Sequence, residues 1–289
     1  MQPVAAPSPM TVVFHADPDA FLAAARAVVS RSPASEAFVA AWCDGLKRRP
    51  PRAGTPLLFA TCEIGDSRAL ALQHGPLPVV LLRSDPAASG AIADALAAQA
   101  RAVPGVHGAE DACEAFAARW RATTGANAVL HARLRHHQLR AVREPPPAPG
   151  AMRAANADDA DWLVEHLDRF VAESGAPAAP EGTSAMVEAR LADGRYRIWE
   201  RDGERVAFLG LVAATPRHGR IGPVWTPPGH RGRGYATSLV ARASAELLAR
   251  GVERVFLVTD LANPTSNAIY ARVGYEPLED DVEVRFVGA

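Results

Sequence analysis

A short basic, glycine-rich segment is the part of this 289-residue sequence whose residue types could do chemistry. It follows an apolar run, Ile221 to Trp225, and reads His230-Arg231-Gly232-Arg233-Gly234-Tyr235-Ala236. A helix that starts at such a turn points unpaired N–H groups outward, and its dipole adds positive potential. The two glycines let a ligand approach the backbone closely, and the two arginines supply fork-shaped donors for phosphate oxygens. The segment is therefore predicted to hold an anion such as a pyrophosphate.

Two other phosphate-binding motifs fit this segment less well. A P-loop needs a lysine after its last glycine, and the only lysine in the sequence is the distant Lys47. A dinucleotide-binding fingerprint needs a third glycine, but Gly232-Arg233-Gly234 continues to Thr237. That fingerprint also needs an acidic residue at the end of the following strand, and none stands at the expected distance.

Together with a later element, the segment resembles the GCN5-related N-acetyltransferases (GNAT). The pyrophosphate loop of that family reads R/Q-x-x-G-x-G/A and is met by Arg231, Gly234 and Ala236. The later element reads N-x6-Y followed by GY or GF, and is met by Asn263, Tyr270, Gly274 and Tyr275. Both motifs stand in the order of the family on a strand–helix–strand–helix pattern. The resemblance covers about half of the chain with specific motifs, and the first half by architecture alone.

The resemblance implies acetyl-CoA, or coenzyme A, as the cofactor. The diphosphate would be held by the turn Arg231-Gly232-Arg233-Gly234-Tyr235-Ala236. In similar proteins the preceding strand splays from its neighbour, binds the pantetheine arm and polarises the thioester carbonyl through backbone amides, much as an oxyanion hole does. That strand end is Val224-Trp225-Thr226 here. The prolines at 227 and 228 remove two ladder donors, which favours a splayed strand.

Tyr270 is the predicted general acid of an acetyl transfer. A tyrosine hydroxyl has a reference pKa of about 10, so it is neutral at working pH and can donate to a departing thiolate. Asn263, Ser266 and Tyr270 stand at i, i+3 and i+7, on one face of a short helix that Asn263 caps. Asn263 is also expected to contact the pantetheine arm, and all three residues belong to the expected cofactor site. Without the neighbouring motif residues, a core tyrosine would be the simpler interpretation of Tyr270.

The general base is left open by the sequence. Glu173 ends the first helix of the second half, beside a proline-containing loop that should border the acceptor pocket, and is the preferred candidate. Glu200 in a strand and Asp260 at a strand end are alternatives, although each could be a purely structural carboxylate. A water relay without a single base is equally compatible with the residues present.

No metal site is expected. His131, His136 and His137 are close in sequence, but they stand in a predicted strand beside arginines, with no cysteine or acidic partner at ligand spacing. The three cysteines are widely spaced and odd in number, so they form no ligand pattern and favour a reducing cytoplasm.

Composition narrows the class of protein. The net charge of −1 gives no basic surface for nucleic acid. No stretch approaches 18 uninterrupted apolar residues, so no membrane span is expected, and the start of the sequence shows no export signal. Hydrophobic content of 48% and charged content of 22% are typical of a soluble globular protein, and the length fits two domains.

A proline-rich segment, residues 144–150, is predicted to link these two domains, 1–143 and 151–289. The second domain is expected to order its elements as two helices, an antiparallel meander, the glycine loop, a helix, a strand, a short helix and a last strand at 282–287. Asp280-Asp281 is interpreted as a polar hairpin before that strand. The fold class is therefore α/β (α+β), with tandem GNAT-like domains that each contain a mixed central sheet flanked by helices.

The first domain is expected to be a degenerate GNAT-like repeat. Its segment at residues 81–90 has Asp85 and Pro86 where the second half has arginines and glycine, and such a turn would not hold a diphosphate. Residues 104–108, which contain a proline and two glycines, are interpreted as another turn. The first domain is therefore expected to pack against other parts or to shape the substrate site.

The sequence predicts a cytoplasmic, acetyl-CoA-dependent N-acetyltransferase acting on the primary amine of a small-molecule or peptide acceptor. The alternative is a non-catalytic coenzyme A sensor or interaction protein, which keeps the loop but does not need the acid Tyr270. The identity of the acceptor stays open, because fold does not fix substrate.

Overall fold

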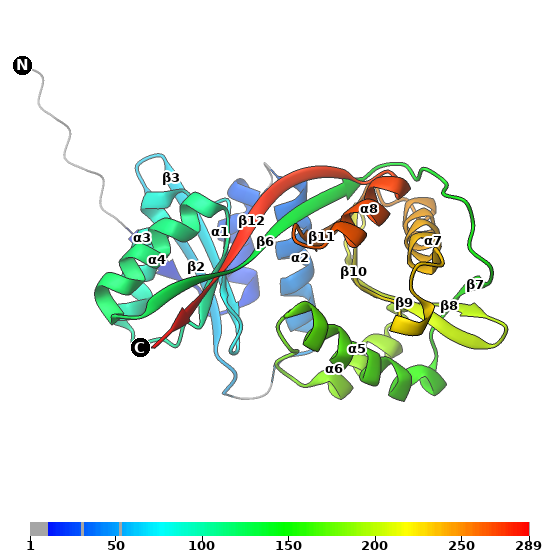
Figure 1. Cartoon of the computed structure of the whole chain (residues 1–289). Helices are drawn as coiled ribbons and strands as arrows, with labels where there is room; N and C mark the ends of the chain where they lie inside the picture. The colour runs from blue at the N-terminus through cyan, green and yellow to red at the C-terminus, as the bar shows by residue number, and fades with distance from the viewer. Residues whose placement is uncertain (1–10, 30–31, 52–53, 289) are drawn as a thin grey trace, which may run out of the picture. The chain divides into compact units, whose positions relative to one another are not determined.

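The computed structural model describes residues 11–29, 32–51 and 54–288, and contacts divide the chain into two units (Figure 1). Unit 1 extends to Leu134 and resumes at Asp280, whereas unit 2 is Arg135–Glu279. The boundaries differ from the expected 1–143 and 151–289, because each falls inside a long strand: β6 (Asn127–Leu139) and β12 (Glu276–Val287). The first ten residues, where no export signal is expected, lie outside the described part.

Unit 1 contains two pairs of helices and a mixed sheet. Its elements before β6 are β1 (Thr11–Phe14), α1 (Pro18–Val29), α2 (Pro33–Arg48), β2 (Leu57–Ile64), β3 (Ser67–His74), β4 (Val79–Leu82), α3 (Pro86–Ala98), β5 (Gly105–Gly108) and α4 (Glu110–Thr124). Strands β1 to β4 are antiparallel neighbours, β5 is parallel to β4, and β12 pairs antiparallel with β5. Alternate residues of β3 face opposite layers: Leu70 and Leu72 pack with α1 and α2, and Ala69 and Ala71 with α3 and α4.

Residues 104–108 were expected to form a turn, and this expectation is wrong, because Gly105–Gly108 form strand β5. A Cβ atom on Gly105 would lie 2.4 Å from the carbonyl oxygen of Val284, and one on Gly108 would lie 2.7 Å from that of Leu81. The glycines therefore permit close approach of neighbouring strands instead of a chain reversal.

The hairpin expected at Asp280-Asp281 is also absent, because both residues lie within the continuous strand β12. Pairing with β5 begins immediately afterwards, at Val282 opposite Gly108. Asp281 is further engaged by His107 on β5, with 3.2 Å between Oδ2 and Nε2. Asp280 and Asp281 are therefore part of a strand and not of a turn.

Unit 2 has the same order of helices, meander, crossover helix and parallel strand. Its elements are β7 (Ala151–Ala154), a 3-10 turn (Ala157–Asp159), α5 (Ala160–Ser174), α6 (Thr183–Ala192), β8 (Tyr196–Arg201), β9 (Glu204–Ala214), β10 (His218–Trp225), a 3-10 turn (Pro228–His230), α7 (Tyr235–Ala249), β11 (Arg254–Asp260) and α8 (Pro264–Val273). Strands β7 to β10 are antiparallel, β11 is parallel to β10, and β6 borders β11. The predicted α/β class, with mixed sheets flanked by helices, is confirmed.

The sheet of unit 2 separates two helical layers (Figure 1). Ile198 and Phe208 pack with α5 and α6, whereas the next residues along the same strands, Trp199 and Leu209, pack with α7 and α8. This alternation follows from the two-residue period of a strand. It leaves the end of β10 between α5 on one side and α7 on the other.

The 3-10 turn that leads into α5 begins at a capping box and ends at a buried carboxylate. The side chain of Asn156 accepts from the N–H of Asp158 at 3.0 Å, and Asp159 accepts from the N–H of Asn156 at 2.8 Å. Asp159 is fully buried and also accepts hydrogen bonds from Arg153 and Arg205. Together these bonds fix the start of α5 against β7 and β9.

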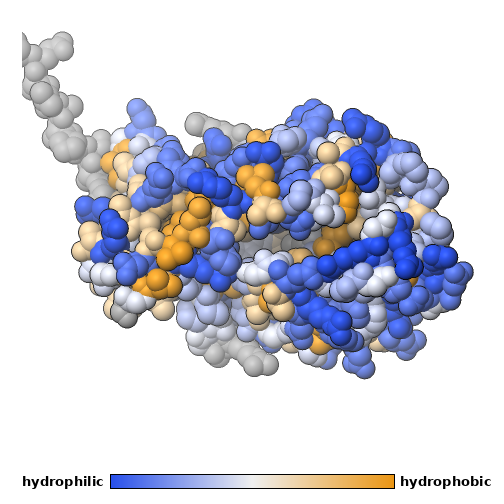
Figure 2. Space-filling view, in the orientation of Figure 1, coloured by the Kyte–Doolittle hydropathy of each residue, from blue (hydrophilic) through white to orange (hydrophobic). Residues whose placement is uncertain are grey.

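Exposed hydrophobic side chains occur on unit 1. Figure 2 shows hydrophobic residues gathered over the part of unit 1 where β6 begins, and Val129 and Leu130 of that strand are 51% and 50% exposed. Among the described helices, none is both long and apolar enough to cross a membrane.

Candidate functional site

Strand β10 separates from β11 soon after their pairing starts. The parallel register runs from His218 opposite Arg254 to Arg220 opposite Phe256. Strand β10 then continues to Trp225. Over this stretch it pairs with β9, at Ile221, Val224 and Trp225. The backbone of the strand end Val224–Trp225 therefore diverges from β11, which makes one side of it accessible for hydrogen bonds to a ligand.

The bend between β10 and α7 is held by two left-handed glycines. Gly234 caps α7 with φ of 82°, and Gly232 has φ of 76°. A Cβ atom on Gly232 would meet no heavy atom within 4 Å, so this backbone faces open space. The N–H of Ser238 donates to the carbonyl of Gly234 at 3.0 Å and closes the first turn of α7. The N–H groups of that turn are oriented out of the positive end of the helix, which is the geometry of an anion site.

The side chain of Arg231 makes three contacts inside unit 2. Its Nε donates to the carbonyl oxygen of Thr226 at 3.0 Å, and its Nη2 donates to Oε2 of Glu173 at 2.9 Å. Its guanidinium carbon lies 4.6 Å from the centroid of the Trp225 ring. An ion pair thus joins Arg231, which is expected to bind the diphosphate, to Glu173, which is expected to be the general base.

Tyr235, the first residue of α7, is tied to β8. Its hydroxyl accepts a hydrogen bond from Nη1 of Arg201 at 2.9 Å. The hydrogen bond from Arg201, with a further one from Arg233, lowers the pKa of Tyr235 below its ordinary value. Arg201 was not among the expected site residues, because nothing in its sequence surroundings ties it to the glycine-rich bend.

Three polar atoms near the end of β10 are buried without a hydrogen-bond partner among the described residues: Trp225 Nε1, Thr226 Oγ1 and His230 Nδ1. An unpaired buried polar group costs about 1–3 kcal/mol unless a ligand or water satisfies it. Two of these residues belong to the expected pantetheine-binding strand end. These unpaired polar atoms therefore fit a ligand that carries amide groups, such as the pantetheine arm of coenzyme A.

His230 has a second connection that the sequence did not reveal. Its Nε2 lies 3.2 Å from Oε1 of Glu204, at the start of β9. The residue stood within the quoted bend, but a lone histidine beside two arginines gave no reason to assign it a role. Its place between β9 and the bend comes from the tertiary structure alone.

Helix α8 carries the other expected site residues. Oδ1 of Asn263 accepts from the N–H of Ser266 at 3.0 Å, so Asn263 caps this helix. Tyr270 is buried, with its ring centroid 5.9 Å from that of Tyr275 and 6.3 Å from that of His137. Burial raises the pKa of Tyr270 above its ordinary value, so its hydroxyl holds its proton at neutral pH.

The expected acid and base lie on different layers of unit 2. Tyr270 packs in the cluster of α7 and α8, whereas Glu173 ends α5 in the opposite layer. Glu173 is paired with Arg231, and the alternative bases also have structural partners. Glu200 accepts a hydrogen bond from Arg153 at 2.6 Å, and Asp260 accepts one from the backbone two residues further on.

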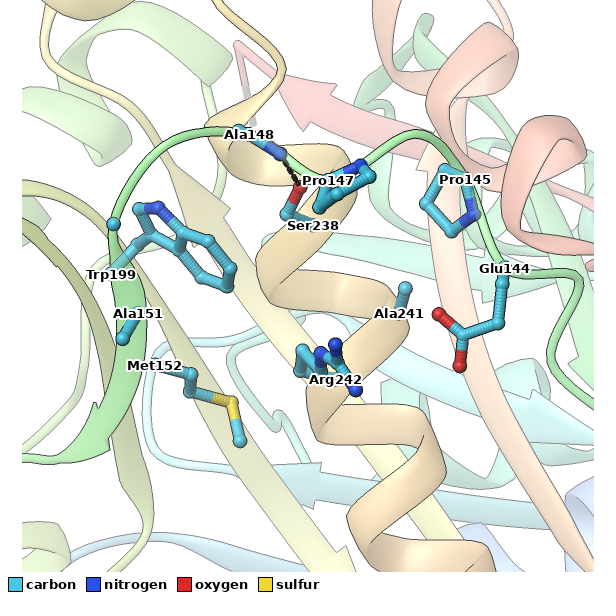
Figure 3. Close-up of a pocket in the computed structure, with 11 residues that line it drawn as sticks. Glu144, Pro145, Pro147, Ala148, Ala151, Met152, Trp199, Ser238, Ala241 and Arg242 are labelled. Carbon is cyan, nitrogen blue, oxygen red and sulfur yellow. Dashed lines mark hydrogen bonds between the residues drawn. The ribbon is translucent and has the colours of Figure 1, made fainter.

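A pocket of about 330 Å³ lies between residues 144–152, β8 and α7 (Figure 3). Glu144, Trp199 and Arg242 are among its lining residues. The proline-rich segment is tied to the helix beside the pocket, because the N–H of Ala148 donates to Oγ of Ser238 at 2.9 Å. The lining includes none of the residues expected to bind the cofactor.

The sequence and the fold are similar to known acetyltransferases. Residues 158–275 match the model of the acetyltransferase (GNAT) family. Mycothiol acetyltransferase of Beutenbergia cavernae is 27% identical over 146 residues, which cover 46% of this chain and 48% of that protein. The chain spans about half the length of the curated relatives it matches.

Several solved structures align with nearly the whole chain. A GCN5-related N-acetyltransferase from Sphaerobacter thermophilus has a TM-score of 0.62 at 17% identity, covering 96% of this chain and 95% of that one. A tandem GNAT protein from the clavulanic acid biosynthesis pathway has a TM-score of 0.59 at 16% identity, covering 96% of this chain and 98% of that one. At these identities the likeness shows the fold alone, and it extends to the N-terminal half.

Proposed function

Because residues 158–275 form a domain of the acetyltransferase (GNAT) family, we propose that this protein is an acetyl-CoA-dependent N-acetyltransferase. The proposal rests on one observation. Gly234 caps the start of α7 with a left-handed backbone, and beside it lies the end of β10, beyond the stretch that pairs with β11. The name of the curated relatives supports acetyl transfer in general. The proposed acceptor is the primary amine of a small molecule or peptide.

The residues of the bend would hold the cofactor by its diphosphate. The first-turn N–H groups of α7 supply several donors, and Arg231 and Arg233 supply full positive charges. The backbone of Val224–Thr226 and the unpaired Nε1 of Trp225 would bind the amide-bearing arm. Asn263 and Ser266 are proposed to approach the same arm from the cap of α8. The bound cofactor supplies an activated acetyl group to the amine.

Two side chains are proposed to handle protons. Tyr270 would give its proton to the thiolate sulfur as the bond from the acyl carbon to sulfur breaks and the bond to the amine nitrogen forms. Glu173 would remove a proton from the incoming ammonium group, directly or through water. Their placement on opposite layers of the sheet is compatible with these roles, because the amine attacks the acyl carbon from one side and the thiolate leaves it on another.

A cytoplasmic location is part of the proposal. Cys43, Cys62 and Cys113 are all free and buried. Burial raises the pKa of Cys43 to about 11 and raises that of Cys62, so both remain protonated thiols at neutral pH. Free, unreactive thiols are compatible with a reducing compartment.

Binding of coenzyme A to the double variant Arg231→Glu with Gly234→Asp tests the proposed function. Both changes place negative charge where the diphosphate would lie, so titration calorimetry should detect no binding. The matched control is Arg121→Glu with Gly125→Asp in α4, where Gly125 is also left-handed with open space around its Cβ position. The control should bind like the parent protein. Equal affinity in both double variants would refute the proposal.

The deep burial of Tyr270 favours a second candidate, a coenzyme A-binding sensor without catalysis. A sensor would need the bend but would not need the tyrosine hydroxyl. Thiol release measured on a panel of primary amines separates the two functions. Cofactor binding without turnover of any amine would favour the sensor.

A further inference from the structure

The pocket of about 330 Å³ beside α7 has a wall whose position is fixed, the proline-rich segment. The N–H of Ala148 donates to Oγ of Ser238 at 2.9 Å. On the other side, Nε1 of Trp199 donates to the carbonyl oxygen of Pro149 at 2.9 Å. A Cβ atom on Gly150 would lie 2.3 Å from a backbone oxygen of β8, so this glycine lets the segment lie directly on the strand. Because proline also limits the backbone, the pocket is formed before any ligand arrives.

Two opposite charges line this pocket without a partner. Glu144 reaches it from the proline-rich segment and Arg242 from α7 (Figure 3). Among the described residues, neither side chain has an ion pair or a hydrogen bond. Arg250, on the same helix as Arg242, does pair with an acid, Glu246. The pocket therefore offers one unpaired charge of each sign to a ligand.

The α7 wall of the pocket carries donors that suit a carboxylate. Ser238 and Arg242 both line the pocket and stand at i and i+4, on one face of the helix. Oγ of Ser238 accepts the bond from Ala148, and its hydroxyl hydrogen has no acceptor among the described residues. A guanidinium and a hydroxyl group one helical turn apart can both donate to a single carboxylate group.

The rest of the lining suits an ammonium group and an apolar side chain. Figure 3 shows Glu144 at one end of the pocket and Trp199 and Met152 at the other, with α7 between them. The carboxylate of Glu144 can accept from an ammonium group. Pro145 and Pro147 have no N–H, so the segment offers carbonyl acceptors and apolar rings at these positions. The pocket therefore provides a cation acceptor, anion donors and an apolar surface in three directions.

We propose that this pocket is a second ligand site of unit 2, which binds a free α-amino acid with an apolar side chain. The ammonium group would lie against Glu144, the carboxylate against Arg242, and the side chain would face Trp199. A polyphosphate would be repelled by Glu144, and a polyamine by Arg242. The volume is at the lower end of the range for small-molecule sites, about 300–1,000 Å³. The inference goes beyond the proposed function, because the lining includes none of the residues assigned to the cofactor or to proton transfer.

Titration calorimetry with L-leucine, without coenzyme A, tests the site. L-leucine should bind at one site, about tenfold more tightly than isocaproate, which lacks the ammonium group, or isoamylamine, which lacks the carboxylate. Glu144→Gln should weaken L-leucine binding about three- to tenfold and leave isocaproate binding unchanged. Arg242→Gln should weaken L-leucine binding by a similar factor and leave isoamylamine binding unchanged.

The controls are Arg272→Gln in α8 and Glu276→Gln in β12, two exposed charges that do not line the pocket. Both control variants should bind L-leucine like the parent protein. Glu144 and Arg242 are exposed as well, so their variants should fold like the parent. No saturable binding of L-leucine, equal affinity for the two analogues and L-leucine, or no effect of either pocket substitution would overturn the site. Since no cofactor is added, these outcomes leave the proposed function untouched.

Discussion

A Cβ atom placed on Gly234 would lie 3.6 Å from the Cβ atom of Ala148, which is an ordinary van der Waals distance. The proline-rich segment therefore passes beside the cofactor bend without crowding it. What requires glycine at position 234 is the left-handed backbone, with φ of 82°, and not lack of space.

Gly234→Ala should accordingly destabilise the protein by about 1–2 kcal/mol through backbone strain. It should also weaken coenzyme A binding, because relief of the strain rotates the first-turn N–H groups of α7. Gly229→Ala is the control, since Gly229 lies in the preceding 3-10 turn without a positive φ and with open space around it. Chemical denaturation and calorimetry of both variants check this expectation. Equal stability of the two would contradict it.

Two neighbouring tyrosines should respond differently to loss of the hydroxyl. Tyr270→Phe should lower kcat about 100-fold with little change in cofactor affinity, if Tyr270 is the general acid. Tyr275→Phe should instead cost about 1–3 kcal/mol of stability, because it leaves the buried Oγ of Ser244 without its partner at 2.9 Å. Steady-state kinetics and thermal melts distinguish the two outcomes. A kcat unchanged by Tyr270→Phe would exclude the acid role.

The raised pKa of Tyr270 also predicts a pH dependence. The protonated hydroxyl is the active form, and burial raises its pKa above the ordinary value of 10. Loss of activity from its deprotonation therefore begins only above pH 10. The profile of kcat should show no falling limb between pH 7 and 10 from this residue. A falling limb that is centred near pH 8 in the parent protein and is lost in Tyr270→Phe would contradict the prediction.

Asp159 should make stability fall in acid. Burial alone would raise the pKa of this carboxyl, but hydrogen bonds from Arg153, the Asn156 backbone and Arg205 outweigh burial and lower it to about 2 from an ordinary 3.8. Because the pKa in the folded state is the lower one, its contribution is complete above pH 4 and is lost as pH falls toward 2. The contribution at neutral pH is about 2 kcal/mol.

Asp159→Asn should therefore lose about 2 kcal/mol at pH 7 and flatten the acid limb of the stability curve. Urea denaturation between pH 2 and 7 provides the measurement. Asp158→Asn serves as the control, because Asp158 is exposed and adjacent. An acid limb of equal steepness in Asp159→Asn and the parent protein would show that other carboxylates dominate.

Replacement of glycine by alanine should have opposite effects at two sites in unit 1, one in β5 and one in α2. Gly105→Ala should destabilise by about 1–3 kcal/mol, because its Cβ would lie 2.4 Å from the Val284 carbonyl and force the strands apart. Gly45→Ala, in the interior of α2 with no heavy atom near its Cβ position, should stabilise by about 0.5–1 kcal/mol. Thermal melting of the two variants checks the sign. A melting temperature of the Gly105→Ala variant equal to that of the parent protein would contradict the close approach of β5 and β12.

The local structure of unit 2 could be predicted because its determinants are local. The Asn263 cap of α8 and the glycine-rich start of α7 act within one or two turns of a helix. The paired glycines of the bend at 232 and 234 likewise require positive φ wherever they occur in a tight turn. Helix limits and the position of the bend followed from these short-range rules.

The pairings within the site could not be predicted because they join distant parts of the chain. Arg231 and Glu173 are 58 residues apart, and Tyr235 and Arg201 are 34 apart. Their meeting depends on how α5 and β8 pack on the sheet, which no short pattern encodes. Strand β5 was missed for a related reason: glycine is common in turns, and its use for close strand approach becomes visible only with the neighbouring backbone in place.

The return of β12 to unit 1 has a consequence for biosynthesis. Ribosomes deliver residues 135–279 before residues 280–287, so unit 2 can fold while unit 1 still lacks the strand that pairs with β5. During translation, the open edge of β5 is a place where a chaperone or a wrong strand can bind. The N-terminal half of the polypeptide is therefore made first but completed last.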